Sequence, residues 1–152
     1  MPLPASTVLT RPFHWGIVVM NDPKLAGQLP DVEPGRMVTA SKFGVIVTVR
    51  HAQDIEADSF DGDFEWAEVT VTSRLLAEVP ADSGWRPVYS GRLLTPSGQL
   101  YLGDADEDVR VPAHPGRSTV TVSVPAELPE EDLTPDAIRI DLLPDTRRKW
   151  WS

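Results

Sequence analysis

Carboxylate side chains are the residues whose spacing in this sequence comes nearest to catalytic chemistry. The stretch from residue 54 to 65 reads DIEADSFDGDFE and carries six of them: Asp54, Glu56, Asp58, Asp61, Asp63 and Glu65. Carboxylates held close together push each other's pKa values apart, which can create a general acid and a general base. No protease-like or glycosidase-like motif surrounds them, however, and alternating acidic residues are typical of a solvated surface. We therefore predict no catalytic residue and interpret the stretch as a docking surface for a basic partner or as an aid to solubility.

A second acidic run, Asp104–Asp108, resembles the start of a calcium loop, since oxygen ligands at alternating positions can face one cation. The EF-hand pattern then fails, because Val109 stands where glycine is required and Pro115 where the bidentate glutamate is required. None of the three histidines lies at metal-ligand spacing. We predict an acidic, solvated hairpin turn and no bound metal.

Motifs for nucleophilic or nucleotide chemistry are absent from the sequence. The chain has no cysteine, which removes thiol nucleophiles, disulfides and zinc ribbons. It also lacks the G-x-S-x-G elbow of serine hydrolases and the glycine-rich patterns G-x-G-x-x-G and G-x-x-x-x-G-K-[ST]. We predict that the protein has no cofactor and is not an enzyme.

The net charge limits the class of partner. A charge of -9 and a pI near 4.7 argue against nucleic acid and anionic membranes, since both reward clustered lysine and arginine. They favour a basic protein partner. The first residues lack the basic start and apolar core of a signal peptide, and no run of about 18 apolar residues occurs. We expect a soluble, cytoplasmic protein.

The last nine residues, 144–152, differ in charge from the rest of the chain. Three basic residues against Asp145 give them a net charge of +2, which leaves -11 for residues 1–143. Cations beside indoles dominate many protein interfaces, so we predict partner contacts from Arg147, Arg148, Trp150 and Trp151. The same tail could instead fold back on its own domain or contact a dimer mate, so a homodimer stays open.

Short apolar runs separated by turn residues must provide the scaffold for these side chains. The clearest is Ser118–Val124, where valines alternate with hydroxyl residues and so indicate a strand with one buried face. Residues 1–12 and 24–36 are interpreted as an extended lead-in and a loop, and Ser73–Val79 could be helical. Strands are expected within 13–20, 43–50, 66–79 and 137–143, with a four-strand β-meander over 85–125 cut by turns at 95–98, 103–108 and 112–116.

These elements predict an all-β fold of about eight strands with little helix. Fifteen prolines against ten glycines disfavour long helices, and no internal repeat is present. The architecture is an antiparallel β-sandwich or a partly open barrel. At 152 residues the chain suits one core, so we expect a single β domain over 1–143 followed by a basic aromatic tail over 144–152.

Three features, taken in order, resemble a family of small β proteins. They are the aromatic strand ending at Asn21-Asp22, the turn and strand VPAHPGRSTVTVSV, and the closing strand AIRIDLLP. The family includes the competence-protein-J-type nuclease inhibitors and related bacterial immunity-type proteins. The resemblance implies a non-enzymatic inhibitor that occupies the basic cleft of a nuclease.

The sequence leaves three hypotheses about function. The first is an acidic protein-binding module, an immunity protein or an inhibitor of a nuclease or toxin, whose carboxylates meet a basic partner. The second is a small-ligand binder or hydrolase-type enzyme with a pocket at the rim of the sandwich, lined by Trp15, Trp66 or Trp85. The third is a structural protein that self-associates through its tail.

Overall fold

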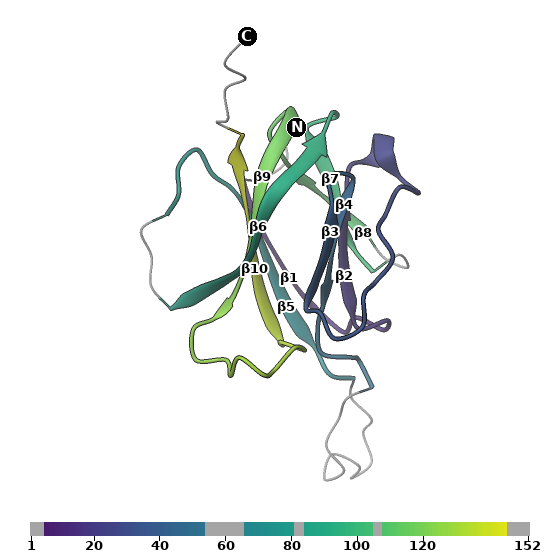
Figure 1. Ribbon diagram of the computed structural model, residues 1–152, viewed down its shortest axis with the longest axis vertical. Helices are drawn as coiled ribbons and strands as arrows, with labels where there is room; N and C mark the ends of the chain where they lie inside the picture. The colour runs from purple at the N-terminus through teal and green to yellow at the C-terminus, as the bar shows by residue number, and fades with distance from the viewer. Residues whose placement is uncertain (1–4, 54–65, 81–83, 105–107, 146–152) are drawn as a thin grey trace.

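The computed structural model describes residues 5–53, 66–80, 84–104 and 108–145, which form two five-stranded sheets packed face to face (Figure 1). Sheet A runs in the order β1 (Ser6–Arg11), β5 (Val69–Leu75), β10 (Ala137–Pro144), β9 (Gly116–Pro125) and β6 (Trp85–Thr95). Sheet B runs in the order β3 (Val38–Ser41), β4 (Gly44–Thr48), β2 (Ile17–Asn21), β7 (Gln99–Gly103) and β8 (Asp108–Pro112). The predicted β-sandwich is confirmed.

The core fills the space between the sheets, as the alternating valines predicted. In β9, Val120, Val122 and Val124 are fully buried, whereas Thr119 and Thr121 lie on the outer face of sheet A. Burying each such side chain contributes about 1.5–3 kcal/mol, which favours one register for each strand. The opposite wall comes from sheet B, with Val18, Met20, Val45, Val47, Leu100 and Leu102.

Two edge strands were not predicted. β1 lies in the proline-bounded lead-in, and it pairs with β5 along its whole length, from Ser6 opposite Arg74 to Arg11 opposite Val69. β3 has only four residues and lies between the predicted loop 24–36 and the predicted strand 43–50, where no element was expected. The one short helical element among the described residues is a 3₁₀ turn, η1 (Pro23–Leu25), and the Ser73–Leu75 part of the ambiguous run is strand.

The predicted β-meander is wrong, although its four strands exist. β6 pairs with β9 in sheet A, and β7 pairs with β8 in sheet B, so only β7 and β8 form a hairpin. The chain crosses between sheets at 96–98 and returns at 113–115. The two crossings contact each other, because the Thr95 hydroxyl donates to the His114 carbonyl at 2.5 Å and the Ala113 amide donates to the Gly98 carbonyl at 2.9 Å. Gly98 has a φ of 72°, which favours glycine there.

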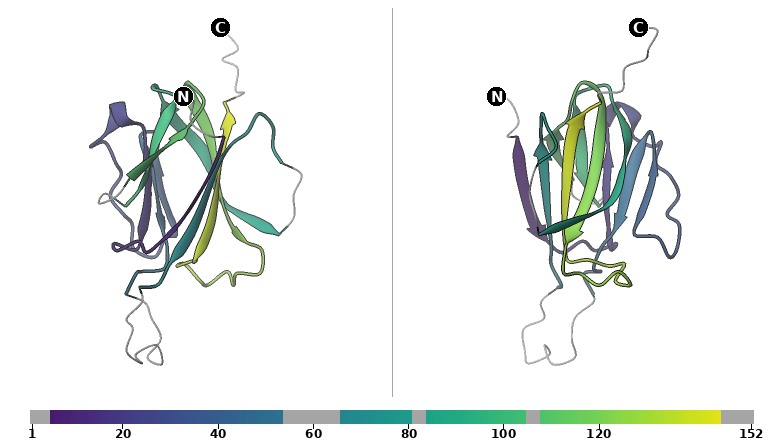
Figure 2. Two further views of the ribbon diagram at one scale, coloured as in Figure 1. Left: turned by 180° about the vertical axis from the view of Figure 1, so that it is seen from behind. Right: turned by 60° about the vertical axis from the view of Figure 1, so that its left-hand side comes forward.

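One pair of strands departs from the antiparallel pattern. β10 lies between β9 and β5 (Figure 2) and pairs antiparallel with β9 but parallel with β5. The connection 126–136 returns the chain from β9 directly into its neighbour, which fixes the direction of β10. β5 begins at the end of the sandwich near Ala67, so the parallel strand β10 begins at that end and finishes at the opposite one. Its last residue, Pro144, lies one residue beyond the predicted end of the strand at residue 143. No helix in the described part is long and apolar enough to cross a membrane.

Candidate functional site

Both ends of the acidic stretch 54–65 connect to one end of the sandwich. The Ala67 amide donates to the Ala52 carbonyl at 2.8 Å, and the Ala52 amide donates to the Phe13 carbonyl at 3.3 Å. Ala52 is fully buried, and so is Phe13. This packed stem anchors the acidic stretch, whose own six carboxylates lie outside the described residues. Residues 53 and 66, which flank that stretch in the sequence, are the described residues nearest to it.

Exposed aromatic side chains flank that stem. Trp15 is 63% exposed and Trp66 is 38% exposed, although tryptophan usually packs into a core. The imidazole of His14 meets the Trp66 ring edge-on, with the ring centroids 5.3 Å apart. We call His14, Trp15, Trp66 and the stem the aromatic end. An exposed tryptophan offers a large apolar surface and a face that attracts cations.

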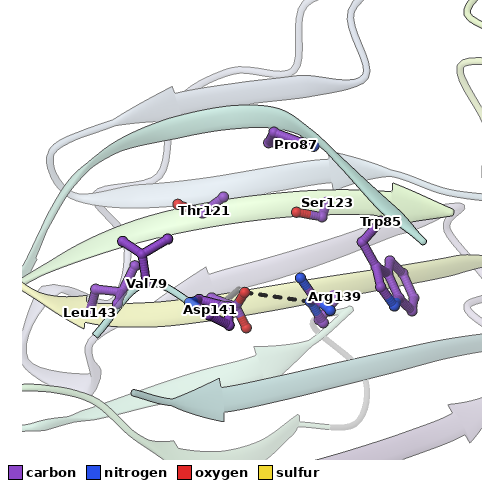
Figure 3. A pocket seen from close by; sticks show the side chains of 9 residues that line it. Val79, Trp85, Pro87, Thr121, Ser123, Arg139, Asp141 and Leu143 are labelled. Atoms are coloured by element: carbon purple, nitrogen blue, oxygen red, sulfur yellow. Dashed lines mark ion pairs between the residues drawn. The ribbon is translucent and has the colours of Figure 1, made fainter. Parts of the chain in front are cut away.

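A groove lies elsewhere, on the outer face of sheet A (Figure 3). The pairing of β6 with β9 is irregular between Pro87 and Tyr89, as expected at a bulge, which bends a strand and increases its twist. Trp85, Pro87, Val79 and Pro80 contribute to its lining, with Val79 and Trp85 at opposite ends of the groove (Figure 3). Its volume is about 170 Å³. Of the three tryptophans considered as pocket residues, the structure assigns only Trp85 to this groove.

The floor of the groove holds a buried ion pair. Arg74 binds Asp141 through two contacts, Nε to Oδ1 at 2.7 Å and Nη2 to Oδ2 at 3.1 Å. Arg139 lies 3.4 Å from Asp141 Oδ2, measured from its Nε, and its guanidinium stacks 5.0 Å from the centre of the Trp85 ring. Arg139 is only 7% exposed and Asp141 only 3%. Bidentate geometry is what makes an ion pair of this kind favourable away from water.

Sequence reasoning missed this groove, although a signal for it was present. In the closing strand AIRIDLLP, two charged residues alternate with apolar ones, which places Arg139 and Asp141 on the outer face of the sheet. Alternation predicts a solvated face for such residues. It could not reveal that the curled β6 would cover them.

The prediction of a solvated acidic turn at 104–108 is wrong for its first residue, Asp104. Asp104 is completely buried, accepting a hydrogen bond from the His14 amide at 3.2 Å and pairing with Arg11 Nη2 at 3.4 Å. Its carboxylate therefore joins the turn after β7 to the connection between β1 and β2. Residues 105–107 lie outside the described residues. Among those described, no three His, Asp or Glu side chains gather where they could hold a metal ion.

The contacts of His114 hold separate segments of the fold together. Its Nε2 lies 2.8 Å from the Leu76 carbonyl and 3.2 Å from the Leu142 carbonyl, and its amide donates to the Ser118 hydroxyl. The ring thus joins the crossing from sheet B to the ends of β5 and β10. The predicted contact residues of the tail, Arg147, Arg148, Trp150 and Trp151, lie outside the described residues.

Comparison with known proteins gives a likeness of fold. No protein-family model matches the chain, and no curated protein matches its sequence significantly. ComJ from Bacillus subtilis, described as an inhibitor of the DNA degrading activity of NucA, superposes with a TM-score of 0.57, covering 94% of this chain and 98% of ComJ at 12% identity. A structure described as crocagin biosynthetic gene J gives 0.48 at 14% identity, covering 93% of this chain and 96% of its own. The predicted resemblance to competence-protein-J-type inhibitors is confirmed as a distant one.

Proposed function

We propose that this chain is a non-enzymatic, acidic binding module of the cytoplasm that inhibits a basic protein, such as a nuclease or a toxin. One observation carries the proposal. The acidic stretch 54–65 is joined at both ends to a surface that bears two exposed tryptophans, Trp15 and Trp66. The inhibitor would act by occupying the cationic cleft of its partner.

The two kinds of side chain would have different tasks. The carboxylates and the net charge of -9 would speed encounter with a cationic surface and orient the approach. The tryptophans would provide apolar contact area and stack against arginine or lysine side chains of the partner. Carboxylates and aromatics together therefore match a basic cleft better than either would alone.

The fold likeness adds support to the proposal. ComJ is described as an inhibitor of a DNA-degrading protein, and it shares its architecture with nearly the whole of this chain. At 12% identity the likeness concerns the fold, so the choice of partner depends on this chain's own surface. That surface is acidic, as a ligand for the basic cleft of a nuclease needs to be.

The basic tail would serve a different contact. β10 ends at the opposite end of the sandwich from the stem at Ala52 and Ala67 (Figure 1). The tail therefore begins away from a basic partner bound at the aromatic end, and the cations Arg147 and Arg148 would find no complementary charge on such a partner. We therefore assign the tail to an acidic surface, and the nearest one available in concentrated solution is the body of a second copy of this chain.

The test screens the products of the genes beside this one for a basic nuclease or toxin and uses that protein as the partner. We expect the purified chain to inhibit that protein and to bind it more slowly as salt rises. The variant Trp15→Ala should weaken binding by about tenfold or more, since truncating an interface tryptophan costs about 2 kcal/mol. Neutralising Asp58→Asn, Asp61→Asn and Asp63→Asn together should mainly lower the association rate. Stopped-flow binding measures both effects.

A matched variant separates local contacts from net charge. Asp31→Asn, Glu33→Gln and Glu78→Gln remove three exposed carboxylates that do not belong to the acidic stretch, so the net charge changes equally. We expect a smaller loss of association rate from this variant. Equal losses in both variants would leave the acidic stretch with no special role, and failure to bind the neighbouring gene product would contradict the inhibitor proposal.

A further inference from the structure

Backbone groups on the outer edge of β1 have no hydrogen-bond partner among the described residues. The strand lies at the margin of sheet A, where its one neighbour is β5 (Figure 2). The Leu75 amide donates to the Ala5 carbonyl at 2.7 Å, and hydrogen-bonded pairs alternate with non-bonded pairs along antiparallel strands. Every second residue of β1 therefore bonds to β5, and the others direct their N–H and C=O groups away from the sheet: Ser6, Val8 and Thr10. These groups form a template for another strand.

The other three edge strands are protected against such pairing. β3 has only four residues, and β8 exposes the charged residues Asp108 and Arg110. β6 has an irregular register, and its Leu94 amide already donates to the Lys42 carbonyl at 2.8 Å. Short length, charge, bulges and a covered edge are the usual devices that prevent unwanted strand pairing. β1 lacks them, since its outward residues are uncharged and its register with β5 is regular over six residues.

The exposed side chains of β1 determine which kind of segment fits. Val8 is 64% exposed, and the hydroxyl residues Ser6 and Thr10 lie beside it on the outer face. Valine and threonine favour strands, and they pair well with β-branched and hydroxyl side chains on a neighbouring strand. The matching segment is therefore extended and carries valine or threonine opposite these residues.

Charge and position indicate which molecule supplies that segment. Residues 1–143 carry a net charge of -11, so a second copy of the body is repelled, whereas a basic protein is attracted. β1 ends at Arg11, opposite Val69, and Val69 follows the stem residue Ala67 by two positions. The edge is thus continuous with the aromatic end, which is the surface assigned above to the basic partner.

We propose that the basic partner adds an extended segment to the edge of β1, antiparallel to that strand. Main-chain hydrogen bonds to Ser6, Val8 and Thr10 would provide affinity, and the side chains opposite them would provide selectivity. The proposal rests on the inhibitor function, because it names a second surface that holds the same partner.

The first experiment titrates the full chain with a peptide while amide signals are followed by ¹H–¹⁵N NMR. The probe is the peptide Lys-Thr-Val-Thr-Val-Thr-Lys, acetylated and amidated at its ends. We expect saturable shifts at Ser6, Val8 and Thr10 and slower hydrogen exchange of their amides. The same peptide with N-methylated valines and threonines keeps its charge but loses its donors, so it should bind about tenfold more weakly or worse.

Variants of Val8 test the edge itself. Val8→Pro removes an outward N–H without breaking a bond to β5, and it should weaken peptide binding by about tenfold. Val8→Lys keeps the backbone and adds a charge of the kind that protects edge strands. Ser90→Lys places the same charge on an exposed position of β6, the opposite edge strand, and should leave binding unchanged. The proposal is overturned if the peptide does not saturate the signals, if the N-methylated peptide binds equally well, or if both Val8 variants bind normally.

The inhibition assay separates this proposal from the inhibitor function. Val8→Lys should weaken inhibition of the basic partner by about tenfold, and Ser90→Lys should not. Full inhibition by Val8→Lys would overturn strand addition and leave the aromatic end as the binding surface. Peptide binding without inhibition of the partner by the full chain would contradict the inhibitor function instead. Dimers of the chain lacking residues 146–152 that Val8→Lys abolishes would assign the edge to a second copy and overturn the choice of partner.

Discussion

Asp104 illustrates how one residue can change its role between sequence and structure. In the sequence it opens an acidic run and suggests a solvated turn. In the fold it is fully buried and receives hydrogen bonds from the His14 amide and from Arg11. A buried carboxylate is tolerated only when its oxygens are paired, because desolvating it otherwise costs several kcal/mol. Asp104 therefore stabilises the connection that carries His14 and Trp15 into the aromatic end.

We expect Asp104→Ala to destabilise the protein by about 3–5 kcal/mol, since the change removes the acceptor of the His14 amide and the carboxylate that pairs with Arg11. Chemical denaturation measures this free energy of unfolding. The control is Asp108→Ala, which removes an exposed carboxylate from the start of β8 and should change stability by less than about 0.5 kcal/mol. Similar losses from the two variants would mean that Asp104 does not hold this connection.

At the scale of elements, β6, which contributes Trp85 and Pro87 to the groove, also holds a close contact within the strand. Tyr89 and Gly91 lie two residues apart on one face, and a methyl group at Gly91 would overlap the Tyr89 ring. Burial raises the pKa of the Tyr89 phenol above its usual value of 10.0. Gly91 thus permits the tyrosine to lie along the strand, next to the irregularity that bends β6.

We expect Gly91→Ala to push the Tyr89 ring toward solvent and to cost about 1–3 kcal/mol through overpacking. The pKa of Tyr89 should then fall back toward 10.0. Because the folded-state pKa is raised, the neutral phenol stabilises the folded protein fully below pH 10.0, and this stabilisation is lost as the pH rises through the folded-state pKa. The variant, whose Tyr89 pKa lies closer to 10.0, should lose less folding stability over that pH range. Ultraviolet titration of tyrosinate measures the pKa, with Tyr89→Phe to assign the signal. Ser90→Ala, on the other face, should leave that titration unaltered.

The strands could be predicted from sequence wherever a strand buries one face. The valines of β9 and the isoleucines Ile138 and Ile140 of β10 repeat every second residue because they face the same core. The edge strands β1 and β3 lack this signal, since few of their side chains are buried. The meander failed for another reason. The turn at 96–98 shows that the chain changes direction, but its residues do not determine which sheet receives the next strand.

The candidate sites were less predictable than the strands, because each depends on contacts between distant segments. The exposure of Trp15 and Trp66 follows from the way the stem closes, and the groove follows from the curl of β6 over β10. Arg139 and Asp141 look like ordinary outward residues until Trp85 and Pro87 cover them. Composition alone could indicate the acidic character of the surface, and that part of the prediction rests on charge rather than on geometry.

The whole molecule has an uneven distribution of charge along its length. The tail of residues 144–152 carries +2 and the remaining chain carries -11. The tail starts at the end of β10, far from the stem of the acidic stretch (Figure 1). A tail and a body of opposite sign attract each other between copies, and the attraction weakens as the Debye length falls from about 10 Å at 0.1 M salt to about 3 Å at 1 M.

Deleting residues 146–152 tests this attraction between copies. We expect the full chain to approach twice its monomer mass of 16.7 kDa in sedimentation equilibrium at low salt, and to return toward the monomer as salt rises. The truncated chain should stay monomeric at every salt concentration, and it should inhibit the basic partner as well as the full chain does. The double variant Trp150→Ala and Trp151→Ala keeps the three basic residues, so partial self-association would assign the attraction to charge. A full chain that sediments as a monomer throughout would contradict the role of the tail while leaving the aromatic end untouched.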